Sequence, residues 1–201
     1  MEFSPTSKTL LFRVRDAEDD AAWRTFVEIY TPLLFRYFRG RGLNETDASE
    51  VLQIVMIAIA RAIRGFEYEP ERGTFRSWLY TVARSKLNDF FNRQARQPMA
   101  LDDEEMARLT DHADETNDKW EAEYRWSVFE WAASQVRSEF QAHTWDAFWR
   151  TAVEGQSADA VAKAFGLKLG SVYTARSRAT ARLRAFIAET LDEDLEPPRR
   201  L

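Results

Sequence analysis

Residues 73–96 read GTFRSWLYTVARSKLNDFFNRQAR, and this stretch decides the fold. Its apolar residues recur at the three- and four-residue spacing of an α-helix, so one side of that helix must be buried. Thr74 stands at its start and belongs to the residue types that cap a helix by accepting from a free backbone N–H group. The predicted buried stripe consists of Phe75, Trp78, Leu79, Val82, Ala83, Leu87 and Phe90.

The opposite side of this predicted helix is polar and carries little charge. Its members are Ser77, Thr81, Arg84, Ser85, Asn88 and Asn92. Short hydroxyl and amide side chains can hydrogen-bond to base edges, and Arg93 and Arg96 at the end of the helix can contact phosphates. A polar face that is only solvated fits this helix equally well, so another part of the chain must decide.

The composition predicts a mostly helical protein. Of 201 residues, 45% are hydrophobic and 30% charged, with 7 Gly and 6 Pro. The chain has no cysteine, which excludes disulfides, thiolate metal sites and cysteine nucleophiles. Its start lacks the apolar core of a signal peptide, and its longest apolar run, residues 54–60, is far shorter than the ~18 residues that span a bilayer. We therefore expect a cytoplasmic protein without membrane insertion.

The acidity of the chain is concentrated in its middle. Residues 98–124 contain ten acidic and two basic residues, whereas the segments on either side are close to neutral. From 98 to 118 there is little apolar periodicity, which is typical of a flexible acidic linker. We expect helical domains at 1–97 and 119–191, and a disordered tail at 192–201.

Two further helices are predicted before residue 73. After a frayed start, residues 19–39 have apolar residues at helical spacing, with a kink at Pro32. The next helix is capped by Asn44 or Thr46 and ends at Gly65.

The first turns of that second helix carry a polar ridge. Asp47, Glu50 and Gln53 follow one another at three-residue spacing and therefore share one side. The helix macrodipole explains acidic residues near an N-terminus, but it does not explain Gln53.

The C-terminal part is rich in tryptophan, with five of the seven tryptophans between residues 120 and 149. We expect them to form the core of a small domain that begins at Lys119. Stacking platforms for nucleic-acid bases are the alternative. Helical spacing relates Trp120, Tyr124, Val128, Trp131, Ala132 and Val136.

Residues 157–186, SADAVAKAFGLKLGSVYTARSRATARLRAF, have the pattern of a helix-turn-helix motif. Ser157 and Ser171 are the predicted N-caps of its two helices, and Gly166 permits the turn. The apolar wedge between the helices would be formed by Val161, Phe165, Leu167 and Val172, with small Ala162 allowing a close crossing.

The second helix of such a motif enters the major groove of DNA with its N-terminal part. Side chains that would face bases or nearby phosphates are Ser171, Tyr173, Thr174 and Ser177. The arginines that would hold the DNA backbone are Arg176, Arg178 and Arg182, whereas Arg184 fits a solvated face.

Taken in order, these segments resemble the sigma factors of the extracytoplasmic-function type, which are promoter-recognition subunits of bacterial RNA polymerase. Residues 47–63, DASEVLQIVMIAIARAI, are similar to the polymerase-binding helix of that family. Residues 73–84 are similar to its most recognisable segment, and residues 157–184 to its terminal helix-turn-helix.

The resemblance implies an all-α protein in which a region 2-like helical bundle and a region 4-like four-helix domain are joined by the acidic linker. It also implies that the core polymerase is a partner, through the clamp helices of its largest subunit and through its flap. The ridge of Asp47, Glu50 and Gln53 would dock on the clamp helices. An anti-sigma factor is a further implied partner, and no metal or cofactor is expected.

The resemblance further implies two kinds of contact with promoter DNA. The loop 66–73 and the next helix would hold the minus-ten element as a single strand with a flipped base, and the helix-turn-helix would read the minus-thirty-five element as duplex. The minus-ten residues would be Arg76, Ser77, Thr81, Arg84, Ser85, Asn88, Asn92 and Arg93. The minus-thirty-five residues would be Ser171, Tyr173, Thr174, Arg176, Ser177, Arg178 and Arg182.

Two other classes of protein are alternatives to this interpretation. A stand-alone helix-turn-helix regulator would bind duplex DNA tightly without polymerase, and it gives Gln53 no role. An enzyme is disfavoured because His112 lies in the predicted linker, His143 is isolated, and no glycine-rich phosphate loop is present. The consecutive acids at 102–105 lack the scaffold that would bring them together on a metal ion.

Overall fold

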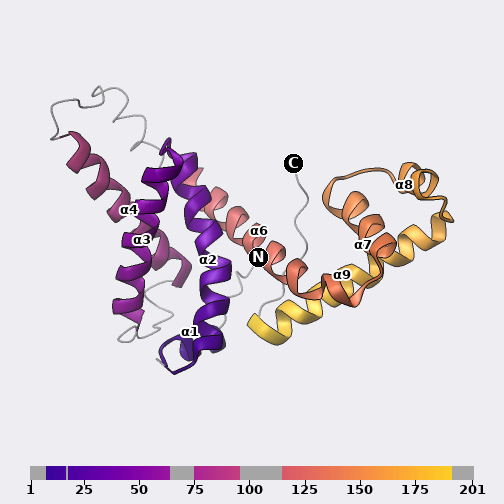
Figure 1. The fold of residues 1–201 in the computed structure, drawn as a ribbon, viewed down its shortest axis with the longest axis horizontal. Helices are drawn as coiled ribbons and strands as arrows, with labels where there is room; N and C mark the ends of the chain where they lie inside the picture. Colours follow the sequence, from indigo (N-terminus) through magenta and orange to yellow (C-terminus); the bar gives the residue numbers. More distant parts are fainter. Residues whose placement is uncertain (1–7, 17, 64–74, 96–114, 192–201) are drawn as a thin grey trace. The chain divides into compact units, whose positions relative to one another are not determined.

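The structure is a computed structural model that describes residues 8–16, 18–63, 75–95 and 115–191. Every regular element in these ranges is a helix, so the predicted all-α fold is confirmed (Figure 1). The helices divide into two compact units, and the division falls within one helix, between Tyr124 and Arg125. Within the described ranges, no helix combines the length and the low polarity needed to cross a membrane.

The first unit is built on three long helices. These are α2 (Asp20–Gly40), α3 (Glu45–Ala62) and α4 (Phe75–Ala95). Helix α3 packs against both α2 and α4, and the short helix α1 (Lys8–Val14) packs against α2. Figure 1 shows α2, α3 and α4 side by side. The unit is thus a small bundle with α3 at its centre.

The core of this bundle is largely aromatic. Phe26 and Tyr30 of α2 have ring centroids 4.4 Å apart, and Phe75 of α4 meets them edge-on at 5.9 and 5.7 Å. The predicted stripe on α4 is confirmed: Phe75, Leu79, Ala83, Leu87 and Phe90 are buried, and Trp78 and Val82 are half-buried. Such a core follows from amphipathic helices burying their apolar sides against one another.

The helix starts obey the capping rules. Asn44 caps α3 by accepting from the Asp47 N–H at 2.9 Å, which decides between Asn44 and Thr46. Asp19 caps α2 by accepting from the Ala22 N–H at 2.9 Å. Helix α2 continues through Pro32 and ends at Gly40, followed by Gly42 with a positive φ of 87°. Only a residue that tolerates this left-handed conformation fits that turn.

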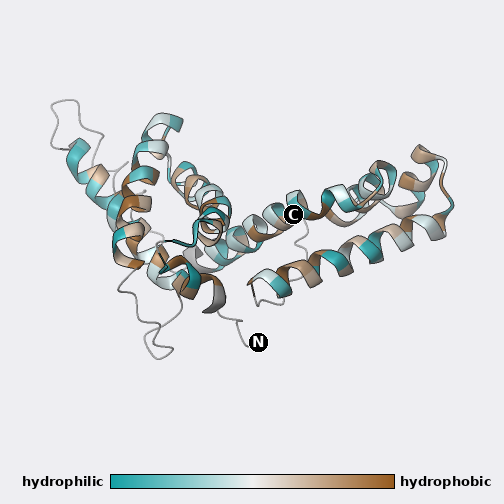
Figure 2. Cartoon of the chain, turned by 60° about the horizontal axis from the view of Figure 1, so that its bottom comes forward, coloured by the Kyte–Doolittle hydropathy of each residue, from teal (hydrophilic) through white to brown (hydrophobic). Residues whose placement is uncertain are grey.

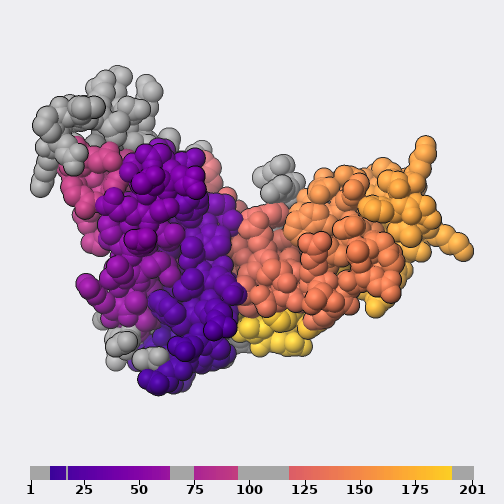
Figure 3. Space-filling view, in the orientation of Figure 1, coloured from indigo at the N-terminus to yellow at the C-terminus, as the bar shows by residue number. Residues whose placement is uncertain are grey.

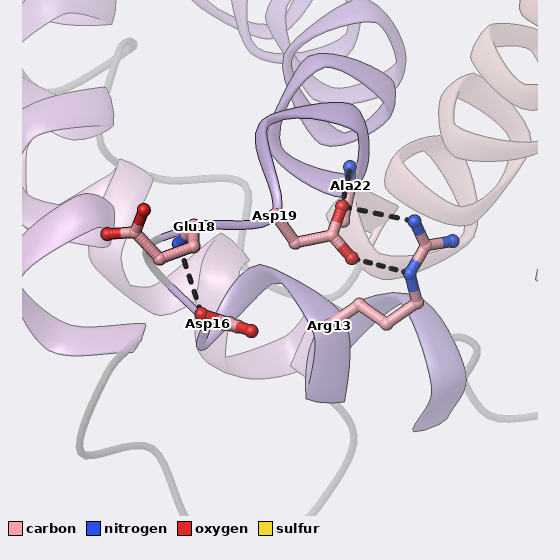
Figure 4. A network of polar contacts seen from close by, with 5 residues as sticks. All are labelled: Arg13, Asp16, Glu18, Asp19 and Ala22. Atoms are coloured by element: carbon pink, nitrogen blue, oxygen red, sulfur yellow. Dashed lines mark hydrogen bonds and ion pairs between the residues drawn. The ribbon is translucent and has the colours of Figure 1, made fainter.

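Asp19 also holds the end of α1 (Figure 4). Its carboxylate accepts two hydrogen bonds from Arg13, at 2.8 and 3.1 Å. These bonds, more than the capping bond, hold the pKa of Asp19 below its usual value. Helix α1 itself was not predicted, because the sequence around it was interpreted as a frayed start. Its Leu10, Leu11 and Val14 are buried against the bundle.

Helix α6 (Glu115–Val136) contributes to both units. Near its start, Trp120 lies against Tyr37 and Tyr80 of the first unit, with ring centroids 5.5 Å away in each case. Tyr124 stacks on Tyr30 at 5.8 Å. The expectation that Trp120 and Tyr124 belong to the core of the C-terminal domain is therefore wrong. Both residues belong to the core of the first unit.

The second unit contains the rest of α6 and the elements after it. A 3₁₀ turn (Arg137–Glu139) leads to α7 (Ala142–Phe148) and a π-helical turn (Trp149–Val153), followed by α8 (Ala158–Phe165) and α9 (Leu169–Leu191). Aromatic contacts tie α6 to this unit, with Phe129 stacked 5.8 Å from Trp149 and Trp131 lying 5.3 Å from Phe186. Of the remaining tryptophans of this segment, Trp131 and Trp145 are buried in this unit, and Trp126 and Trp149 are half-buried.

Helices α8 and α9 form the predicted helix-turn-helix. Ser157 caps α8 by accepting from the Ala160 N–H, and Gly166 ends that helix in the left-handed conformation with φ 63°. Val161, Ala162 and Val172 share one buried cluster, against which Phe165 and Leu167 pack. Helix α9 begins at Leu169, so Ser171 lies inside its first turn and is not the cap that the sequence suggested.

Several predictions lie outside the described residues. They concern the Thr74 cap, the helix end at Gly65, the loop 66–73, Arg96, residues 98–114 of the predicted linker and the tail 192–201. The last residues of the predicted linker, 115–118, are helical because α6 starts at Glu115.

Candidate nucleic-acid interface

The polar ridge on α3 is accessible in the structure. Glu50 and Gln53 are exposed and Asp47 is partly exposed. Asp47 is held in place by Asn44, whose amide donates to its carboxylate at 2.9 Å. Ile57, one turn beyond Gln53, is 52% exposed and was not picked out from the sequence. The ridge therefore offers acid, amide and apolar groups along one side of a helix, as a protein partner would require.

An ion pair joins this ridge to α4. Arg93 donates to Glu50 at 2.9 Å, and its guanidinium lies 5.5 Å from the ring centre of Phe90. Both side chains of the pair are about half exposed, so solvent screening limits it to less than about 1 kcal/mol. A residue predicted to contact polymerase is thus adjacent to one predicted to contact DNA.

The polar face of α4 is exposed nearly as predicted. Ser77, Thr81, Arg84, Ser85 and Asn92 are exposed, and Asn88 is half-buried. Thr81 donates back to the carbonyl of Ser77 at 2.9 Å, which leaves its oxygen able to accept a further bond. Hydroxyl, amide and one guanidinium group are therefore presented on a rigid helix.

Arg76, which was predicted to contact the minus-ten element with that face, lies in a different environment. It is 4% exposed, donates to Glu121 of α6 at 3.2 Å, and lies 4.5 Å above the ring of Tyr124. A buried guanidinium needs such a partner, because an unpaired charge would be strongly destabilising. The structure thus places Arg76 between α4 and α6 within the first unit, away from the exposed polar face.

Two tyrosines next to this face were not singled out from the sequence. Tyr37 of α2 and Tyr80 of α4 meet edge-on at 5.7 Å, and the guanidinium of Arg41 lies 5.3 Å from the Tyr37 ring centre. Burial, and secondarily the neighbouring Tyr80, raise the pKa of Tyr37, so its hydroxyl stays protonated. The spacing of these tyrosines in sequence gives no sign that they meet.

The first turns of α9 present the predicted base- and phosphate-facing groups to solvent. The exposed residues are Ser171, Tyr173, Thr174, Arg176, Ser177 and Arg178. Tyr173 is 54% exposed, which is unusual for a large aromatic ring and leaves it available for a ligand. Figure 3 shows narrow projections from the orange surface that holds α8 and the start of α9. Figure 2 shows hydrophilic residues in bands along the long C-terminal helix.

Arg182 is held differently from the other arginines of α9. It donates twice to Glu139, at 2.7 and 2.9 Å, and a second acid, Glu189, lies 3.7 Å away. The paired hydrogen bonds hold the pKa of Glu139 below its usual value. A guanidinium engaged in this way is less available to a phosphate than Arg176 or Arg178, for which the described part of the chain supplies no ion pair.

Two comparisons with known proteins find similarity over the residues that form these surfaces. Residues 26–97 match the family model described as sigma-70 region 2, which covers α3 and α4 and most of α2. Over 189 residues the chain is 23% identical to the ECF RNA polymerase sigma factor SigE of Mycolicibacterium smegmatis. That alignment covers 94% of this chain and 70% of the relative.

Both matches include the ridge on α3 and the polar face on α4, and the longer alignment extends over most of the chain, as the order of the motifs implied. Residues 26–97 thus correspond to a sigma-70 region 2, and the chain is similar over most of its length to a sigma factor of the extracytoplasmic-function type.

Proposed function

We propose that this protein binds core RNA polymerase and directs it to promoters, where it reads one element as duplex and holds the other as a single strand. The polymerase would be met by the α3 ridge of Asp47, Glu50 and Gln53, which the resemblance assigns to the clamp helices. Ile57 extends that ridge by one turn and adds the apolar contact that polar residues alone do not supply. Since its partner would be the polymerase, we expect the protein to act in the cytoplasm.

The observation that carries the proposal is the exposed, nearly neutral polar face of α4. A face meant only to be solvated is normally rich in Glu and Lys, whereas this one presents Ser77, Thr81, Ser85 and Asn92. Hydroxyl and amide groups on a rigid helix can bond the edges of unstacked bases. Arg84 supplies a cation for the backbone of the same strand.

Arg76 is left out of this proposed DNA contact because its buried guanidinium is paired with Glu121. Arg93 remains in it, because the exposed pair with Glu50 is weak enough to be exchanged for a phosphate. Extruding a base from the duplex costs a few kcal/mol, which stacking and base-edge contacts must offset. By binding the extruded bases, α4 would therefore favour melting of the promoter.

The duplex element would be read by α9. The first turns of a second helix in a helix-turn-helix lie in the major groove, so Tyr173 and Ser177 would face bases, and Thr174 a base or a nearby phosphate. Arg176 and Arg178 would neutralise phosphates and give the binding its dependence on salt.

The decisive test is transcription in vitro with purified core RNA polymerase on a pool of genomic fragments, with and without this protein. We expect new, discrete start sites that share two sequence elements at fixed spacing. If no start sites appear while the protein alone binds duplex DNA tightly, the stand-alone regulator is the correct function.

A further inference from the structure

An open pocket of about 570 Å³ lies within the second unit, between α7 and the start of α9. Three cationic or N–H-donating side chains line it, each from a different element: His143 from α7, Lys168 from the turn before α9, and Arg178 from α9. Hydroxyls of Thr144 and Ser171 add further donors. The lining residues include no Asp or Glu, so nothing in the pocket neutralises the cations.

The cations of the pocket are not engaged elsewhere. In the described part of the chain, neither Lys168 nor Arg178 has an ion-pair partner. Other exposed cations of the chain do pair with an acid, as Arg182 does with Glu139 and Arg93 with Glu50. Two unpaired cations that converge with hydroxyl donors on one hollow favour an anion with several acceptor oxygens.

The residues that line the pocket also indicate which kind of anion it can bind. Its apolar residues are Ala147, Leu167 and Ala175, and no aromatic ring is among them. A free nucleotide would need Arg178 or His143 to stack on its base, which would withdraw that group from the phosphate. The pocket is suited to the phosphate and sugar of a polymer strand, which can pass through an open groove.

The pocket is continuous with the DNA-reading part of α9. Ser171 and Arg178 are seven residues apart, which is close to two helical turns, so both point to the side of α9 that borders the pocket. Tyr173 is five residues from Arg178 and therefore points roughly 140° away around the helix. Thr174 also lines the pocket, so this side of α9 can hold the backbone while Tyr173 and Ser177 reach bases.

We propose that this pocket binds a backbone phosphate of the duplex, through Lys168, Arg178 and an imidazole N–H of His143. The contact would fix the register of α9 in the major groove, because phosphate contacts position a protein without reading sequence. The inference rests on the proposed function and adds to it two residues, His143 and Lys168, that lie outside the residues predicted to contact DNA.

The first test follows the histidine ring resonances of the full-length protein by NMR. The chain has only two histidines, so His112 is an internal control for His143. Adding a short duplex of unrelated sequence at low salt should shift the His143 resonance and leave that of His112 in place. The same concentration of inorganic phosphate should leave both in place. An equal response to inorganic phosphate would assign the pocket to a free anion, and no response to duplex would overturn the proposal.

The second test compares two lysines of the same unit by fluorescence anisotropy with labelled duplexes. Lys168→Ala should weaken binding of promoter and unrelated duplexes by the same factor, roughly five- to tenfold at ~50 mM salt, and lower the salt slope by about one. Lys163→Ala, which removes an exposed lysine of α8 outside the pocket, should stay within about twofold of wild type. Equal losses in both variants, or none in Lys168→Ala, would contradict the proposal.

The two proposals can fail separately. If transcription with core polymerase yields no promoters while His143 still responds to duplex, the proposed function is wrong and the pocket remains a duplex-binding site. If start sites appear but neither His143 nor the Lys168→Ala variant responds as expected, only the pocket assignment is wrong.

Discussion

The two helices that we assign to DNA, α4 and α9, differ in how their arginines are held. On α4, Arg76 is buried against Glu121 and Arg93 is paired with Glu50, which leaves a face dominated by hydroxyl and amide groups. On α9, Arg176 and Arg178 are exposed, and the described residues provide no ion pair for either. A nearly neutral face suits the edges of unstacked bases, whereas free cations suit the phosphates of a duplex.

The arginines of α4 and α9 also differ in how much they contribute to the stability of the fold. Arg76 connects α4 to α6 inside the first unit, so its removal acts on stability. Arg176 and Arg178 contribute little to the core of the second unit, so their removal should act on binding alone. Mutations that separate stability from binding therefore test the comparison directly.

The largest expected effect is on the buried pair. Glu121→Ala removes the carboxylate that accepts from the buried guanidinium of Arg76, which should lower the free energy of unfolding by about 3 kcal/mol. Thermal or urea unfolding of the full-length protein measures it.

Glu123→Ala is the matched control for that variant. Glu123 is two residues away on α6 and is bonded to Arg36 at 2.7 Å, but its side chain is 46% exposed. Its loss should cost less than about 1 kcal/mol after solvent screening. If both variants are equally stable, Arg76 is not held by Glu121, and it would return to the set of candidate DNA contacts.

The next effect concerns the free arginines of α9. Arg176→Ala and Arg178→Ala should each reduce the affinity for promoter duplex about tenfold and lower the slope of log affinity against log salt by about one, with no change in unfolding. Arg182→Ala should change the slope less, because Glu139 already holds that guanidinium. A larger slope change for Arg182→Ala than for Arg178→Ala would contradict our inference that Arg178 is the more available of the two to a phosphate.

A smaller effect is expected at the α3 ridge. Replacing Glu50 and Gln53 by Ala should weaken binding to core polymerase while helicity stays intact, because both side chains are exposed. Glu50→Ala alone should also release Arg93, so a loss of polymerase binding should not be accompanied by a loss of single-strand binding. Unchanged co-purification of the double variant with core polymerase would remove the ridge from the interface.

Acid should affect the second unit slightly through Glu139. Its pKa is lowered in the folded protein by the hydrogen bonds from Arg182, so the carboxylate stabilises the fold above its ordinary pKa. That contribution is lost as pH falls from the ordinary value of 4.5 through the lower folded value. Between pH 7 and pH 3, Glu139→Gln should therefore show a shallower decline in stability than wild type. An identical decline would mean that the pair does not form in solution.

Sequence reasoning found what is encoded locally. The buried stripe of α4, the caps at Asn44 and Ser157, and the turn at Gly166 depend on residues within a few positions of one another. It missed the Arg76–Glu121 pair because the partners are 45 residues apart in sequence. No periodicity connects them, and the resemblance placed Arg76 among the minus-ten residues.

Helix α6 shows a second limit. Trp120 and Val128 fall on one side of a regular helix, so the pattern indicated a single core. In the structure the start of that helix packs on the first unit and its remainder on the second, and periodicity cannot reveal such a change of partner. The sequence does contain a sign of this change of partner. The start of α6 carries two aromatic residues and an acid, Trp120, Tyr124 and Glu121, which are the side-chain types that pack on tyrosines and pair with an arginine, as they do here with the bundle and Arg76.

The central claim is that α4 binds the minus-ten element as a single strand and α9 binds the minus-thirty-five element as duplex. It is tested most directly by open-complex formation on two templates, one fully paired and one with the minus-ten region pre-melted. With core polymerase, a variant lacking Arg176 and Arg178 should fail on the paired template and recover on the pre-melted one. A variant of α4 with Thr81, Ser85 and Asn92 replaced by Ala should remain defective on both. Recovery of the α4 variant on the pre-melted template, without recovery of the α9 variant, would contradict the account.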